Sequence, residues 1–216
     1  PCGIMDQTVV ELAESGQALL LDCADQTARS VPFDSQAPAL LVIDSGVSHA
    51  LAEGAYAQRR ADCEQTCAQL GVNTLREVSL DQLARLKDEG VLLQRATHVV
   101  SENQRVCDAV TAIEQRQWNR LGALMTASHR SLRDDYEVSC PELDLLEELA
   151  TAERGVYGAR MTGGGFGGCV IVLVASERLE AVADSLSGQY NEHMGWAPGC
   201  YRIQASAGAR EICTTL

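Results

Sequence analysis

The chain has 216 residues, of which 46% are hydrophobic and 22% charged, the composition of a globular protein with one large domain or two small ones. Its formal net charge of −13 repels phosphate backbones and anionic lipid surfaces, which argues against nucleic acids and membranes as partners. No apolar run approaches the ~20 residues that a membrane-spanning helix needs.

The first stretch, from Pro1 to Gln7, is a Pro/Gly turn that contains a carboxylate, Asp6, and precedes a helical pattern closed by Gly16. The positive end of a helix dipole favours the ionised form of such a carboxylate. Asp6 can cap the helix, which is the commoner use, or face a pocket and accept a substrate proton as a general base. The residues alone favour the cap and leave the base open.

Further along the chain, the hydrophobic pattern indicates strands near both ends and helices between them. We expect strands at residues 18–23, 27–33, 39–45, 156–162, 169–174 and 200–205. We expect helices at residues 50–71, 79–90, 92–113, 118–132, 141–149 and 176–191, with capping boxes at Ser79/Gln82 and Ser139/Glu142. This order favours the α+β class, with a domain boundary between Asp34 and Pro38.

Two polar stretches follow predicted elements and leave their roles open. Asp44 ends an apolar strand, where sites often gather, although an Asp there also suits a simple turn. The dense run from Ser128 to Tyr136 is expected to hold helices together rather than to react. His98 is predicted to lie in the core or between helices, and His193 at the surface.

The nine cysteines are scattered singly, without a C-x-x-C pair or a signal-peptide pattern. They predict reduced, mostly buried thiols in a cytoplasmic protein. Cys63 and Cys67 lie four residues apart on a predicted helix, but no second cluster accompanies them. No metal site is therefore predicted.

Residues 163–168, with the sequence GGGFGG, form a glycine loop between two predicted strands. Gly163, Gly165 and Gly168 match the spacing of a dinucleotide fingerprint, but a strand follows instead of the helix that would hold the pyrophosphate. A Walker loop is excluded because Cys169 and Val170 stand where Lys and Ser/Thr are required. Glycines permit unusual φ and ψ and a close approach, so a ligand contact and an empty tight turn are about equally favoured.

Five stretches along nearly the whole chain, taken together, resemble one family: PCGIMDQ, DSGVSHAL, YAQRRADC, SHRSLRDDYEVSCPELD and RMTGGGFGGCVI. They are similar to the galactokinase family of the GHMP small-molecule kinases, and the last two are highly specific. The resemblance implies a GHMP kinase C-terminal domain, an antiparallel sheet with a block of helices, at residues 36–216. It also implies a remnant of the N-terminal domain at residues 1–35.

The same resemblance implies phosphoryl transfer from ATP, with Mg²⁺, to the anomeric hydroxyl of galactose, which yields galactose 1-phosphate. Asp6 matches the aspartate taken as catalytic base. Gly3 matches a backbone contact to the sugar, and Tyr56 matches a tyrosine that hydrogen-bonds a sugar hydroxyl. The motif that supports the phosphate-binding loop is matched by Gly163, Gly164, Gly165, Gly167 and Gly168.

The chain departs from the family because two motifs that precede the GIMDQ segment do not occur in it. One supplies an arginine and acidic residues around the sugar, and the other is the glycine- and serine-rich loop that cradles ATP phosphates. We therefore expect the C-terminal part of a galactokinase that is inactive alone, binds little or no ATP, and self-associates through apolar surface on residues 1–35. Two alternatives stay open: a galactokinase-like sugar and ATP sensor without turnover, and an N-acetylgalactosamine kinase.

Overall fold

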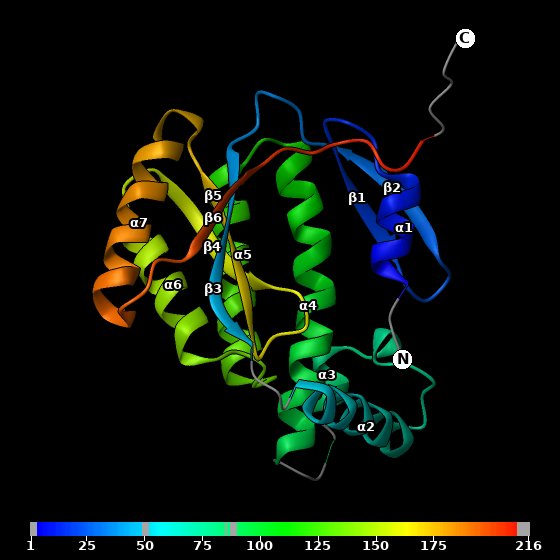
Figure 1. Cartoon of the computed structure of the whole chain (residues 1–216). Helices are drawn as coiled ribbons and strands as arrows, with labels where there is room; N and C mark the ends of the chain where they lie inside the picture. Colours follow the sequence, from blue (N-terminus) through cyan, green and yellow to red (C-terminus); the bar gives the residue numbers. More distant parts are fainter. Residues whose placement is uncertain (1–3, 49–51, 85, 87–89, 211–216) are drawn as a thin grey trace.

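The computed structural model describes residues 4–48, 52–84, 86 and 90–210, and it contains a four-stranded sheet, a two-stranded hairpin and seven labelled helices within these ranges (Figure 1). The strands are β1 (Gln17–Asp22), β2 (Thr27–Pro32), β3 (Ala39–Ser48), β4 (Val156–Thr162), β5 (Gly167–Val174) and β6 (Gly199–Ile203). The helices are α1 (Met5–Leu12), α2 (Ala52–Leu70), α3 (Leu80–Leu83), α4 (Val91–Glu114), α5 (Trp118–Asp134), α6 (Pro141–Ala152) and α7 (Leu179–Met194). Short 3₁₀ turns occupy Leu75–Glu77 and Ser176–Arg178.

The larger sheet has the order β4-β5-β3-β6, and all of its neighbouring strands are antiparallel. Helices α6 and α7 cover one face, where Leu41, Ile43 and Val172 of the sheet pack with Leu146 and Leu186 and are fully buried. Figure 1 shows α4 on the other side of the sheet from α7. Because helices cover both faces, β3 and β5 read as continuous apolar runs rather than as alternating patterns.

On the second face, Leu173 of β5 packs with Ala112 of α4 and Leu121 of α5. Helix α2 and the short α3 lie against α4 and form a separate hydrophobic cluster with it, which contains Leu75, Leu83 and Val100. The molecule is therefore layered, with the sheet between two groups of helices. This arrangement confirms the predicted α+β class.

Helix α1 and the β1–β2 hairpin lie beside this layered body, with β1 and β2 paired antiparallel (Figure 1). No residue of α1 is buried, and its exposed apolar side chains include Met5 at 56% and Val10 at 58%. The C-terminal segment returns to this helix, where the Gly208 N–H donates to Ala13 O at 2.7 Å and the Ala209 N–H donates to Val10 O at 2.6 Å. Exposed apolar surface at residues 1–35 is thus confirmed for α1.

Two helix starts differ from the expectation. Helix α1 begins at Met5 because the Ile4 carbonyl already accepts hydrogen bonds from the Thr8 N–H and hydroxyl, so Asp6 lies inside the first turn and is not the cap. At α6, the Ser139 hydroxyl donates to Asp144 Oδ1 at 2.6 Å, and no side-chain cap forms. The N-cap is Cys140, one residue later than expected, so Ser139 lies just before the helix start.

Two other expectations also need correction. Of the helix predicted at residues 79–90, the described residues form a single turn, Leu80–Leu83, with its capping box present, and residues 85 and 87–89 lie outside the described part. The cysteines are not mostly buried: of the seven that the structure describes, all are free and only Cys140 is buried. The reason is that four of them line an open cavity of about 540 Å³ between the hairpin, α2 and α4: Cys23, Cys63, Cys67 and Cys107.

Among the described residues, no helix combines the length and the apolar character needed to cross a bilayer.

Candidate functional site

An open cleft of about 770 Å³ lies where α1, the end of β3 and the turn between β4 and β5 meet. Helix α1 contributes Asp6, and β3 contributes Asp44 and Gly46. The β4–β5 turn contributes all of residues 162–169, which include the glycine loop, residues 163–168. The structure therefore brings the candidate base and the glycine loop, more than 150 positions apart in the chain, into one site.

The glycine loop is held from behind by the segment that precedes α6. The Phe166 N–H donates to Val138 O at 2.7 Å. Gly165 has φ +85°, and a Cβ there would lie 2.2 Å from the same carbonyl oxygen. Because that contact is with backbone, a side chain at Gly165 would displace the loop or the segment behind it.

Gly164 has no such structural requirement. Its φ is outside the left-handed region, and a Cβ built on it would meet nothing within 4 Å. Neither backbone conformation nor internal packing among the described residues therefore explains this glycine. A backbone without a side chain that faces an open cleft allows the close approach of a ligand or of another chain segment.

The end of β3 is fastened to the same loop by a buried hydroxyl. Ser45, fully buried, donates from Oγ to Gly168 O at 2.8 Å. Its own carbonyl accepts hydrogen bonds from the Tyr190 hydroxyl at 2.9 Å and the Trp196 indole N–H at 3.1 Å. These contacts lie where the β3–β5 register shifts between Asp44 and Ser48. The irregularity thus begins directly after Asp44, the last residue of β3 in regular register with β5, which lines the cleft.

The described lining of the cleft is acidic. It contains two carboxylates, Asp6 and Asp44, and no arginine or lysine. Burial, and then the charge of Asp44, raise the pKa of the Cys169 thiol in the same lining, which keeps it protonated and unreactive. The cleft offers carboxylates and backbone groups, so it can accept a proton or share a cation, but by itself it would repel a bare triphosphate.

The other predicted site residues lie elsewhere. Tyr56 is on α2 with 51% of its surface exposed, and it is not among the residues that line the cleft. Gly3 lies outside the described residues. The sequence reasoning left Asp44 undecided between a turn and a site, and the structure gives it both roles: Oδ1 accepts the Gly46 N–H at 3.0 Å, and the residue lines the cleft.

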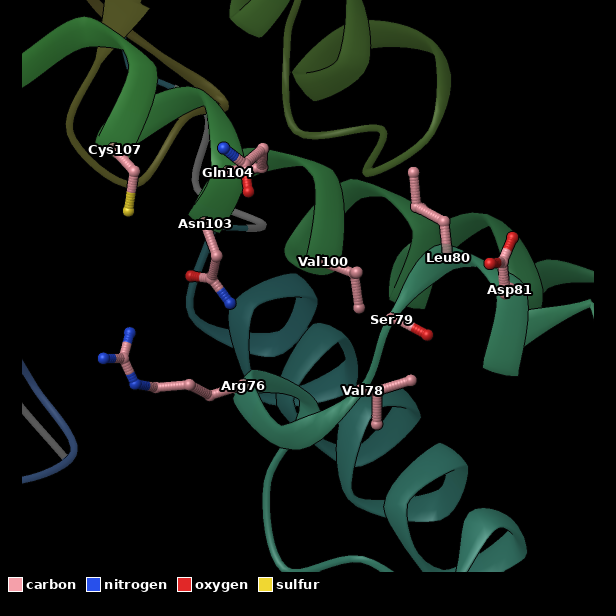
Figure 2. Close-up of a pocket in the computed structure, with 9 residues that line it drawn as sticks. All are labelled: Arg76, Val78, Ser79, Leu80, Asp81, Val100, Asn103, Gln104 and Cys107. Carbon is pink, nitrogen blue, oxygen red and sulfur yellow. The ribbon is translucent and has the colours of Figure 1, made fainter. Parts of the chain in front are cut away.

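A second open cavity, of about 550 Å³, lies between α4 and residues 76–81. Figure 2 shows Asn103 and Cys107 projecting from α4 on the side that faces Arg76. Arg76 is paired with Asp22 of the hairpin. Its described lining contains a single carboxylate, Asp81, and the Ser79 hydroxyl there is engaged in the α3 capping box, whereas the first cleft joins two carboxylates to the glycine loop and is the better candidate for chemistry.

Among the described residues, no group of three or more His, Cys, Asp or Glu side chains is arranged to hold a metal ion. A magnesium ion in a phosphoryl-transfer site usually needs only one or two carboxylates, because substrate phosphates and water complete its coordination. The two cleft carboxylates are compatible with that mode.

Comparisons with known proteins find relatives of this chain in sequence and in fold. Residues 109–192 match the family model described as GHMP kinases C terminal. The chain is 44% identical to the galactokinase of Homo sapiens over 99% of its own length and 54% of that protein, and 44% identical to the galactokinase of Streptomyces coelicolor over 98% of its length and 56% of that protein. It thus spans about half the length of the curated relatives it matches.

A solved structure, Lactococcus lactis galactokinase complexed with galactose, superimposes with a TM-score of 0.92 at 34% identity, covering 98% of this chain and 56% of that one. Residues 109–192 therefore match the C-terminal domain of the GHMP kinases, and the chain is similar to galactokinases in sequence and fold over nearly its whole length.

Proposed function

We propose that this chain is part of a galactokinase, which transfers the terminal phosphoryl group of ATP to the anomeric hydroxyl of galactose and forms galactose 1-phosphate. The observation that carries the proposal is the meeting of Asp6 and the glycine loop in one cleft. The similarity to galactokinases at 44% identity supports the choice of sugar.

In this proposal Asp6 is the general base. It lies in the first turn of α1 and lines the cleft beside the glycine loop. The carboxylate accepts the proton of the anomeric hydroxyl as that oxygen attacks the terminal phosphorus, and the bond to the ADP oxygen breaks. Gly3 and Tyr56 contact the sugar, in line with the positions that they match in the family.

The glycine loop supports the nucleotide side of the reaction. Its backbone approaches the phosphate-binding elements closely, which the open position at Gly164 permits. Asp44 would be the cleft carboxylate left to hold a magnesium ion bound with ATP, because Asp6 serves the sugar hydroxyl, and that ion would neutralise phosphate charge.

The 216 residues alone are expected to lack measurable kinase activity and to bind ATP weakly, because the described cleft lining offers no cation to a triphosphate. Isothermal titration calorimetry of the chain with Mg²⁺-ATP tests this expectation. Robust micromolar binding would contradict it.

We further propose that residues 1–35 belong to an N-terminal domain and residues 36–216 to the C-terminal one, and that the chain self-associates when α1 is uncovered. The unburied α1, with Met5 and Val10 exposed, supports both statements. Analytical ultracentrifugation of the chain should show concentration-dependent association that Val10→Asp reduces. Sedimentation as a monomer at all concentrations would contradict the self-association.

We place the protein in the cytoplasm, where its thiols stay reduced. All seven described cysteines are free, and two of them, Cys23 and Cys107, are exposed.

A coupled ADP-release assay on the full-length protein tests the activity. We expect ADP release that depends on galactose, with a higher kcat/KM for galactose than for N-acetylgalactosamine. Binding of galactose and ATP without ADP release would contradict the kinase function and favour a sugar sensor without turnover. A preference for the N-acetylated sugar would reassign the substrate.

A further inference from the structure

We propose that Arg95, on α4, is a positioning residue that holds the glycine loop in the cleft by clamping residues 135–138, the segment behind the loop. Arg95 does not line the cleft. The clamp itself is a statement about this chain, and its kinetic consequence rests on the proposed kinase function.

The Arg95 side chain is only 2% exposed, so its charge must be compensated within the protein. Its guanidinium donates to the backbone carbonyl of Asp135 and, at 2.5 Å, to Glu137 Oε2. Its Nε lies 3.9 Å from Asp62 Oδ2 on α2. Two of the three contacts are therefore made to the segment behind the loop.

A second arginine completes the clamp from α2. Arg59 donates from Nε to the Tyr136 carbonyl at 2.5 Å and from Nη2 to the Glu137 carbonyl at 3.0 Å. The backbone carbonyls of three consecutive residues, 135–137, thus accept hydrogen bonds from the two arginines. Glu137 has φ 51°, a left-handed conformation that costs a non-glycine residue energy, so this turn persists only with external support.

The next residue, Val138, connects the clamped residues 135–137 to the glycine loop. Its side chain and backbone are buried at 4% exposure, and its carbonyl accepts the Phe166 N–H at 2.7 Å. The same carbonyl occupies the space that a Cβ on Gly165 would need. Any shift of residues 135–137 therefore moves the hydrogen-bond acceptor of the loop, and the loop has to follow.

A purely structural role for Arg95 would be a buried countercharge that stabilises the packing of α2 against α4. Such a role predicts a global loss of stability and no selective effect on the loop. Positioning predicts a local effect at Phe166, and this difference defines the experiment.

Amide hydrogen exchange of the 216-residue chain distinguishes a local effect at Phe166 from a global loss of stability, with Arg95→Lys as the variant. Lysine keeps the charge but lacks the planar fork that reaches two acceptors at once. We expect the Phe166 amide to exchange at least about tenfold faster relative to the Val172 amide in β5 than it does in the parent chain. Equal changes at Phe166 and Val172 would overturn the proposal.

Leu83→Ala is the matched control, because Leu83 is buried in the same α2–α4 cluster but belongs to α3. It should speed both amides equally. Glu137→Gln is the second variant, since its side chain is 55% exposed and its loss should spare the fold. It removes the charged acceptor of Arg95 and should loosen Phe166 in the same direction, and an unchanged Phe166 amide in this variant would also contradict the clamp.

In the full-length protein, Arg95→Lys should lower kcat at least about tenfold and leave KM for galactose unchanged, because the loop serves the nucleotide side. Failure of the kinase proposal would remove this kinetic effect and leave the exchange result intact. Failure of the clamp would remove the selective exchange at Phe166 while galactose-dependent ADP release remained.

Discussion

The two sides of the cleft are held in opposite ways. Asp6 is carried by α1, a helix without a single buried residue, whose backbone is tied to residues 208–209. The glycine loop joins two strands whose residues Met161, Val170 and Val172 are completely buried, and Val138 fixes it from behind. The loop side is therefore expected to unfold only with the core, whereas the Asp6 side can open locally at much lower free energy.

Core truncation should separate the two sides most clearly. Leu146→Ala removes a fully buried side chain between α6 and the sheet and should lower the free energy of unfolding by about 2–5 kcal/mol. Val10→Ala, on the exposed face of α1, should change it by less than about 0.5 kcal/mol. Chemical denaturation of both variants measures this. Similar losses would mean that α1 belongs to the cooperative core.

The loop side also contains a buried titratable group. His98 stacks on Tyr136 with ring centroids 4.5 Å apart, and its Nδ1 lies 3.0 Å from Ser131 Oγ. Burial, partly offset by the charge of Glu102, lowers the pKa of His98 to about 4, below its unfolded value of 6.5. Between pH 6.5 and about pH 4, His98 takes up a proton only in the unfolded chain. Its contribution to the free energy of unfolding is therefore fully present above pH 6.5 and falls by roughly 2–3 kcal/mol towards pH 4.

Denaturation curves between pH 4 and pH 7 test this, with His98→Gln as the variant. Glutamine does not titrate, so the variant should be less stable at pH 7 but should have a flatter dependence on pH in this window. An unchanged pH dependence in His98→Gln would assign the effect to other groups.

Two neighbouring glycines offer the finest comparison. Gly165→Ala has to displace the Val138 carbonyl from a position with φ +85°, and we expect a loss of at least about 1 kcal/mol in stability. Gly164→Ala meets nothing within 4 Å and should stay within about 0.5 kcal/mol, yet kcat/KM for ATP should fall if phosphate-binding elements approach here. A stable Gly164→Ala protein with unchanged kinetics would show that Gly164 is an ordinary turn residue without a role in ATP binding.

Much of the fold could be predicted from the sequence, because hydrophobic periodicity reports burial directly. The long pattern at residues 92–113 becomes α4, Val91–Glu114, and the apolar run from Ala39 becomes β3. Helix starts were less predictable. The Ser139/Glu142 spacing indicates a cap at Ser139, but α6 starts one residue later, with Cys140 as N-cap, and the Ser139 hydroxyl donates to Asp144 instead.

The candidate site could be predicted only in parts. Spacing alone favoured Asp6 as a cap, and the family resemblance assigned it to catalysis; the structure excludes the cap, since Ile4 holds that position, and places Asp6 in the cleft. The meeting of Asp6 with the glycine loop depends on tertiary packing that no local pattern encodes. The same holds for the arginine clamp, because Arg59 and Arg95 reach residues 135–137 across helices.

The role of Asp6 is tested most directly by steady-state kinetics of Asp6→Asn in the full-length protein, beside Glu11→Gln, which removes another exposed carboxylate from the same helix. We predict that Asp6→Asn lowers kcat by about 10²-fold or more with little change in KM for galactose, and that Glu11→Gln is unaffected. Near-normal turnover of Asp6→Asn would contradict its assignment as the base.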